Sequence, residues 1–165
     1  MLDIAQLRKN VIQPTLRGLG MYSRSAENLL IGTAVQESGL TYLRQLGGGP
    51  AHGIYQIEPN THQDIWENYL NHRPEMGKKV IYFASLGSYH NSRNQELIFN
   101  LAYATAICRI HYRRVKAPLP DADDVAGLAR YWKRYYNTHL GHGTEQQFMD
   151  NYHSQVLGMD QEGTA

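Results

Sequence analysis

The sequence predicts one mainly α-helical domain with a small β element, an α+β fold, on three observations. Apolar residues recur at the helical spacing of about 3.6 over most of the chain, and strand-like alternation is limited to one short stretch. Glycine and proline separate these segments at positions where helices end or begin. The length of 165 residues suits a single domain over residues 1–165.

Apolar spacing and capping residues predict the first two helices. The first covers about residues 3–19, and Pro14 should kink or break it because proline has no amide hydrogen to donate. The second starts near Ser23 or Ser25 as the N-cap and ends at Gly39, because glycine is favoured just past a helix C-terminus.

A loop and a short strand are predicted between about residues 40 and 58. The run L-G-G-G-P-A-H-G is typical of a flexible loop, and G-I-Y-Q-I at 53–57 alternates as a strand does. Helices should follow at Pro59 and near Pro74, since proline is tolerated in a first turn. Residues 85–94 have the composition of a loop.

The run from 94 to 112 carries apolar side chains on most of its sides. This predicts a buried central helix enclosed by the others, with Cys108 as a small core residue. Acidic residues within 121–124 should open the next helix, where the macrodipole favours negative charge. The last helix starts at Thr144 and frays near the C-terminus.

Composition excludes several classes of protein. Sixteen Lys and Arg against fifteen Asp and Glu give a net charge of +1, which disfavours a dedicated nucleic-acid binder. No apolar run approaches the roughly 20 residues of a membrane span. Residues 1–10 mix charges of both signs, so we expect no signal peptide. Cys108 alone can form neither an intrachain disulfide nor a multi-cysteine zinc site.

Glu37 is a candidate general acid. It falls in the last turn of the second predicted helix, where the partial negative charge of the helix end disfavours an ionised carboxylate. Apolar Val35 and Leu40 nearby indicate incomplete solvation, and both effects should raise the pKa of Glu37. A carboxylic acid that stays protonated near neutral pH can donate a proton to a glycosidic oxygen. The alternative is a side chain that extends into water.

Three motifs carry a family resemblance: E-S-G-L at 37–40, G-I-Y-Q-I-E-P-N-T-H at 53–62 and R-Y-Y-N-T at 134–138. In this order and spacing they resemble the lytic transglycosylases and goose-type lysozymes of the lysozyme-like superfamily. The resemblance implies a helical bundle around a buried central helix, with a small β element lining a glycan groove. It also implies cleavage of the β-1,4 bond between N-acetylmuramic acid and N-acetylglucosamine in peptidoglycan.

The same resemblance assigns roles to matching residues. Glu37 would be the acid, and the hydroxyl of Tyr136 would orient it. Substrate would be contacted by the remaining matched positions, namely Ser38, Gly53, Tyr55, Gln56, Ile57 and Asn137. The chain departs from the family pattern where Tyr55 replaces the common Met, and where Thr138 and His139 replace Ala-Gly.

A second carboxylate, Glu58, leaves the reaction type open. Goose-type lysozymes have an acidic residue at this place, and an inverting hydrolase needs a base roughly 6.5–9.5 Å from the acid. Most transglycosylases have an apolar residue there and release 1,6-anhydro products with one carboxyl group. Glu58 could also be a solvated residue before Pro59. His62 matches a goose-type histidine, with a structural role at the helix start as the alternative.

We expect no metal and no cofactor. His139 and His142 form H-L-G-H without an H-E-x-x-H motif or a carboxylate cluster, which favours an ordinary loop pair. The basic stripe of Arg109, Arg113, Arg114 and Lys116 is interpreted as a solvated helix face, with contact to anionic cell-wall polymers as a lesser alternative.

The expected partner is the glycan strand of bacterial peptidoglycan, bound by a monomer, alone or with other virion proteins. A different class stays open: a virion protein that keeps the fold as a scaffold or glycan-binding module and has little activity. Because the substrate lies outside the cytoplasm and no signal peptide is expected, a bacteriophage origin is the simplest hypothesis. The protein would then be carried in the virion or released to the cell wall at lysis.

Overall fold

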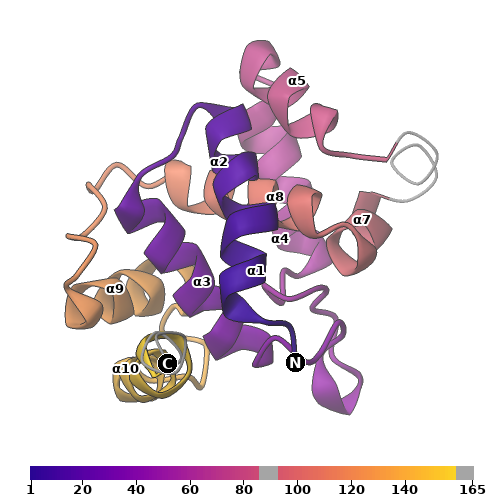
Figure 1. Cartoon of the computed structure of the whole chain (residues 1–165). Coiled ribbons are helices and arrows are strands. Elements are labelled where there is room, and N and C mark those ends of the chain that lie inside the picture. Colours follow the sequence, from indigo (N-terminus) through magenta and orange to yellow (C-terminus); the bar gives the residue numbers. More distant parts are fainter. Residues whose placement is uncertain (86–92, 159–165) are drawn as a thin grey trace.

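The structure is a computed structural model that describes residues 1–85 and 93–158, and it is mainly helical, as predicted (Figure 1). The α-helices are α1 (Ile4–Leu7), α2 (Gln13–Leu19), α3 (Arg24–Ser38), α4 (Pro59–Ile65), α5 (Pro74–Tyr82), α7 (Arg93–Phe99), α8 (Leu101–Arg113), α9 (Val125–Trp132) and α10 (Glu145–Asn151). Turns of π-helix are η1 (Arg8–Ile12), η3 (Trp66–Leu70), η4 (Lys133–Asn137) and η5 (Tyr152–Leu157), and η2 (Leu46–Gly48) is a 3₁₀ turn.

Helix α8 is the centre of the bundle. Its residues from Tyr103 to Ile110 are all buried, and α2, α3, α4, α5 and α7 pack against it (Figure 1). Cys108 is fully buried there, so its predicted core role is confirmed. The predicted helix over 94–112 is nevertheless two helices. Asn100 interrupts it with an extended backbone, and its Oδ1 accepts the amide of Tyr103 and caps α8.

The first two predicted helices are present. Residues 4–19 form one continuous helical segment, and Pro14 does not break it. The wider π-turn η1 ends at Ile12, two residues before Pro14, in the turn that a proline ring crowds. Ser23 caps α3 by accepting the amide of Ala26, and Gly39 ends it with a left-handed backbone at φ 56°.

The predicted strand at 53–57 is wrong. Within residues 1–85 and 93–158 there are only isolated bridges between Arg44, His52 and Ile57, and residues 53–56 form a turn. A Cβ on Gly53, whose φ is +73°, would lie 1.8 Å from the carbonyl oxygen of Leu97. The chain therefore turns tightly against α7 at this point. That turn buries two consecutive apolar side chains, so the apolar pattern here reflects insertion into the core and not pleating.

The remaining helix starts agree with the prediction. Pro59 and Pro74 open α4 and α5, and Asp124 caps α9 by accepting the amide of Gly127. Thr144 opens α10 with a reciprocal capping box. Most of the loop predicted over 85–94 lies outside the described residues, as does the end of the chain predicted to fray. No helix in the described ranges has the length and apolarity needed to cross a membrane.

Candidate active site

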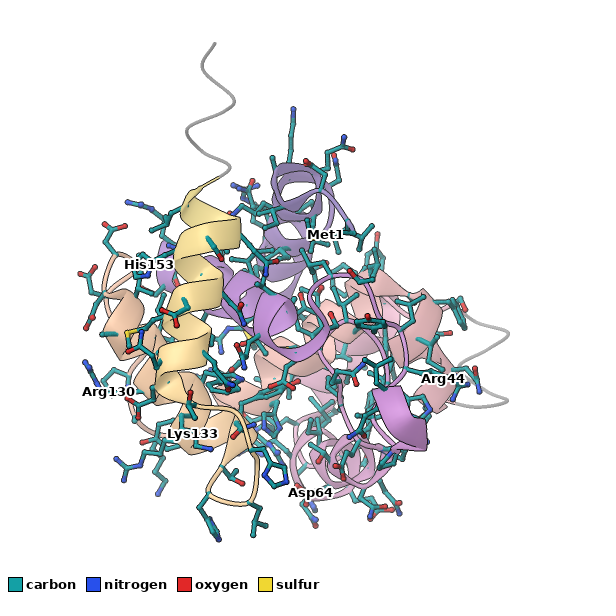
Figure 2. The ribbon with its side chains drawn as sticks, turned by 90° about the horizontal axis from the view of Figure 1, so that it is seen from below. Met1, Arg44, Asp64, Arg130, Lys133 and His153 are labelled. Atoms are coloured by element: carbon teal, nitrogen blue, oxygen red, sulfur yellow. The ribbon has the colours of Figure 1, made fainter. Side chains whose placement is uncertain are left out.

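A cleft of about 630 Å³ lies where the ends of several helices meet. Its walls come from the last turn of α3, the segment 45–58 with the first turn of α4, the end of α8, and η4 with the loop that follows it. In Figure 2, Arg44, which directly precedes the wall segment 45–58, and Lys133 of η4 lie on different sides of the molecule, with Asp64 of α4 between them at the lower edge. The volume is within the range of about 300–1,000 Å³ that is typical of ligand sites.

Glu37 lies in the wall of this cleft, in the last turn of α3. Its side chain is half-buried, and Trp132 Nε1 donates a hydrogen bond of 2.9 Å to its Oε1. Burial raises the pKa of Glu37 to about 7, although the hydrogen bond from Trp132 acts in the opposite direction by stabilising the carboxylate. The predicted upward shift is therefore confirmed, and the group is partly protonated near neutral pH.

Five more of the predicted residues line the same cleft: Gln56, Ile57, Glu58, Tyr136 and Asn137. Gln56 has a left-handed backbone with φ 48°, a conformation that residues other than glycine rarely adopt. Its Nε2 donates to the carbonyl oxygen of Gly53 at 2.9 Å. Glu58 is the exposed N-cap residue of α4, and its carboxylate accepts no amide from that helix. The structure therefore brings a half-buried and an exposed carboxyl group to one cleft.

Two predicted substrate contacts, Ser38 and Gly53, are not in the cleft. Ser38 is buried at the end of α3, where its Oγ donates to the carbonyl oxygen of Ala34 and accepts the amide of Leu40. Both hydrogen bonds satisfy backbone groups at the end of α3, so the hydroxyl of Ser38 does not face the substrate cleft. Gly53 is buried against Leu97, as described above, so it fixes the turn instead of lining a groove.

The substrate contacts predicted for Tyr55 and His62 are also wrong, because both side chains are buried. Tyr55 is fully buried, and its hydroxyl shares a 3.0 Å hydrogen bond with Thr105 of α8, so it cannot stack on a sugar. His62 is 2% exposed, with Nδ1 2.8 Å from Asn94 Oδ1 and Nε2 2.9 Å from the hydroxyl of Tyr103. It is a hydrogen-bonded core histidine, and burial lowers its pKa.

Tyr136 lines the cleft but holds a different partner from the one expected. Its hydroxyl donates a 2.7 Å hydrogen bond to the backbone carbonyl of Tyr55, and so joins η4 to the opposite wall. The bond to the acid comes from Trp132 instead. Asn137 Oδ1 accepts Nζ of Lys133 at 2.6 Å, which fixes the amide at the cleft margin.

Trp132 and His111 are site residues that the sequence did not reveal. The indole of Trp132 is buried between α3 and α10. In the sequence, Trp132 is only an apolar position five residues before Asn137, which does not mark it as a site residue. His111 lies in the last turn of α8 and in the wall of the cleft, and its ring is edge-to-face with that of Tyr136 at a centroid distance of 4.9 Å. Arg114 Nη2 lies 2.9 Å from His111 Nδ1. Because a guanidinium can only donate, Nδ1 accepts and the imidazole is neutral.

Burial and the charge of Arg114 lower the pKa of His111 to about 4, so this ring stays neutral at the pH where Glu37 titrates. Arg114 is also paired with Asp64 of α4. A chain of contacts therefore runs from α4 through Arg114 and His111 to Tyr136. The neutral imidazole adds no positive charge to the wall of the cleft, where a protonated histidine would lower the pKa of the acid.

Backbone strain also occurs at the cleft. Within residues 1–85 and 93–158, three residues other than glycine have positive φ, namely Leu40, Gln56 and Thr138, and the last two line the cleft. Thr138 ends η4 at φ 63° and ψ −178°, and its amide donates to the carbonyl oxygen of Lys133 at 2.8 Å. Strained backbone of this kind persists where the surrounding structure fixes it, and it is common at functional sites.

The structure also bears on the histidine pair, the basic stripe and the clusters that could hold a metal. Among the described residues, no group of three or more His, Cys, Asp or Glu is placed to hold a metal ion. Both histidines of the pair are exposed, and His142 lines the cleft whereas His139 does not. The solvated-face interpretation of the basic stripe is wrong for Arg109, which is 8% exposed.

Searches for similar proteins returned nothing: no protein-family model, no curated protein and no solved structure matches this chain.

Proposed function

We propose that this protein is a peptidoglycan-cleaving muramidase, with Glu37 as the general acid on the bond between N-acetylmuramic acid and N-acetylglucosamine. The observation that carries the proposal is a half-buried carboxyl group with a pKa of about 7 in the wall of a ligand-sized cleft. The family resemblance of the three motifs supplies the substrate class. Most of the matched residues, including Gln56, Tyr136 and Asn137, line that same cleft.

In this mechanism, protonated Glu37 donates its hydrogen to the bridging glycosidic oxygen as the bond from that oxygen to the anomeric carbon breaks. The carboxylate that forms accepts the indole N–H of Trp132, so this bond strengthens as negative charge develops. Donors and acceptors for hydroxyl and N-acetyl groups come from Gln56 and Asn137. Neutral His111 adds no positive charge that would ionise the acid early.

Glu58 is the base of the proposed hydrolytic reaction. It is open to water and lines the cleft that contains Glu37. As a carboxylate it would take a proton from a water molecule that attacks the anomeric carbon from the opposite face of the sugar ring. The product would then carry a reducing end with inverted configuration.

The second candidate is a lytic transglycosylase that uses the same acid. It is favoured because the carboxylate of Glu58 caps no amide of α4, so this helix does not fix the carboxylate in one position for holding a water molecule. Glu37, after donating its proton, would then remove the proton from the 6-hydroxyl of the sugar as that oxygen attacks the anomeric carbon. The product would be a 1,6-anhydro sugar.

The test uses purified sacculi and three variants. The native protein should release soluble fragments, and Glu37→Gln should abolish release with an unchanged circular dichroism spectrum. Glu75→Gln is the matched control, because Glu75 is an exposed glutamate on α5 outside the cleft. Binding to sacculi without release by the native protein would contradict the enzymatic proposal and support a glycan-binding module.

Mass spectrometry of the fragments separates the two reactions. Reducing ends that are lost in Glu58→Gln support the hydrolase. Anhydro ends that persist in Glu58→Gln support the transglycosylase and contradict the role of Glu58 as a base.

A further inference from the structure

A second, smaller hollow of about 170 Å³ lies beside the C-terminal half of α8. It is lined by Arg109 and Arg113 of α8, by the segment 115–119 that includes Lys116, and by Tyr131 of α9. It shares no lining residue with the cleft. The hydroxyl of Tyr131 donates to the carbonyl oxygen of Ala117 at 2.9 Å, which holds the segment 115–119 against α9. We call this feature the basic hollow.

Arg109 is the residue of the basic hollow that needs an explanation. It is 8% exposed, and its buried Nε has no hydrogen-bond partner. No carboxylate within residues 1–85 and 93–158 forms an ion pair with it. Burial, and next the charge of Arg113, lower the pKa of Arg109. Buried charges in folded proteins are ordinarily paired, because moving a charged group out of water costs free energy that only a partner can offset.

Other partly buried arginines of the chain do have such partners. Arg8 pairs with Glu27 at 2.9 Å, and Arg114, five residues after Arg109, pairs with Asp64. The lining of the basic hollow contains no acidic residue. Three cationic side chains therefore surround a space that no negative charge of the described protein enters.

We propose that the basic hollow binds a phosphate-type oxyanion, paired with Arg109 and flanked by Arg113 and Lys116. A guanidinium presents a planar fork of N–H donors that matches two oxygens of a phosphoryl group. The hollow is smaller than the sites of about 300–1,000 Å³ that take drug-sized ligands, so it suits one phosphoryl group and not a sugar chain. The group is either free phosphate or the phosphodiester of an anionic polymer.

Isothermal titration calorimetry with inorganic phosphate tests the site, at an ionic strength held constant with sodium chloride. The native protein binds phosphate, and Arg109→Met weakens binding at least about tenfold, since a buried charge-assisted pair is lost. The control Arg130→Met, in an exposed arginine of α9 that lies near Asp124, leaves the affinity unchanged within about twofold. Equal weakening by both variants, or no binding by the native protein, overturns the proposal.

A double variant guards against misfolding of Arg109→Met. Arg113→Gln with Lys116→Gln changes two exposed side chains, and it should weaken phosphate binding about fivefold and reduce its dependence on salt. Unchanged affinity in this variant also counts against the site. Titration with poly(glycerol phosphate) identifies the source: tighter binding per phosphoryl group than inorganic phosphate indicates a polymer, and weaker binding indicates the free ion.

Discussion

Glu37 in the cleft and Arg109 in the basic hollow are both ionisable groups withdrawn from water without an oppositely charged neighbour, yet burial has different consequences for them. Burial raises the pKa of Glu37 to about 7, so this group can become neutral by keeping its proton. Burial lowers the pKa of Arg109, but the ordinary pKa of an arginine is so far above neutral that the guanidinium stays charged at neutral pH.

The same desolvation can therefore create two kinds of site. A carboxyl group escapes the cost of burial by protonation, and the result is a proton donor suited to general-acid catalysis. A guanidinium cannot escape in that way, and the result is a site that attracts an anion. Four predictions test this contrast, beginning with the largest expected effect.

The largest effect is on activity. We expect Glu37→Gln to reduce fragment release from sacculi about 10³-fold, because a positioned general acid contributes about 10²–10⁴ to the rate. Arg109→Met should change the rate less than about twofold, since Arg109 lines a different hollow. The rates are measured from soluble fragments at pH 6. Equal losses of rate in both variants would show that the cleft and the basic hollow act as one site.

The second effect is on stability as a function of pH. The folded-state pKa of Glu37 lies above the ordinary value of 4.5, so native protein binds more protons than unfolded protein between about pH 4.5 and 7. Stability is therefore lost as the pH rises through this window. Relative to native protein, Glu37→Gln should gain about 2 kcal/mol above pH 7 and nothing near pH 4. Urea unfolding at both pH values measures it, and a gain independent of pH would contradict it.

The third effect concerns Arg109 when no phosphate is present. Replacing a buried charge that lacks an acidic partner with an apolar side chain of similar volume is often stabilising, and we expect Arg109→Met to raise the Tm by about 2–4 °C. Arg114→Met should lower the Tm, because it leaves Asp64 and His111 without their shared partner. Differential scanning calorimetry in phosphate-free buffer compares the two. A lower Tm in both variants would show that Arg109 is not an uncompensated charge.

The smallest effect is on the pH profile. Trp132 stabilises the ionised form of Glu37, so Trp132→Phe should raise the pKa of the acid further. We expect the alkaline limb of kcat/KM to fall near pH 7 in the native protein and to move up by about 0.5–1 pH unit in the variant. Tyr131→Phe, a matched change on the same helix whose hydroxyl bonds Ala117, should leave the limb in place. A downward shift in Trp132→Phe would reverse the assignment of Trp132.

Local signals in the sequence predicted most helix boundaries. Ser23, Gly39, Asp124 and Thr144 each bond the backbone of a helix end or adopt its left-handed turn, and these interactions span only a few residues. The break at Asn100 was missed because an asparagine cap within a continuous apolar run has no distinct pattern. The strand at 53–57 was wrong because alternation cannot be told from a turn whose apolar residues enter the core.

For the site, the sequence correctly placed Glu37, Gln56, Glu58 and Asn137 in one cleft. It misassigned Tyr55 and His62, whose residue types suit both a sugar groove and a hydrogen-bonded core. Which of these a side chain enters depends on packing against α8, and residue spacing does not contain that information.

Local sequence patterns were enough to predict that the chain is mainly helical, where most of its helices start and end, and that a glutamate falls at a helix end among apolar residues. Those features depend on bonds between neighbours along the chain. Three other features come from packing: Trp132 donates to Glu37, His111 is neutral beside Arg114, and Arg109 is buried without a carboxylate among the described residues. Each of these depends on distances between segments remote in sequence, and electrostatic energies are fixed by those distances and by the water that packing excludes.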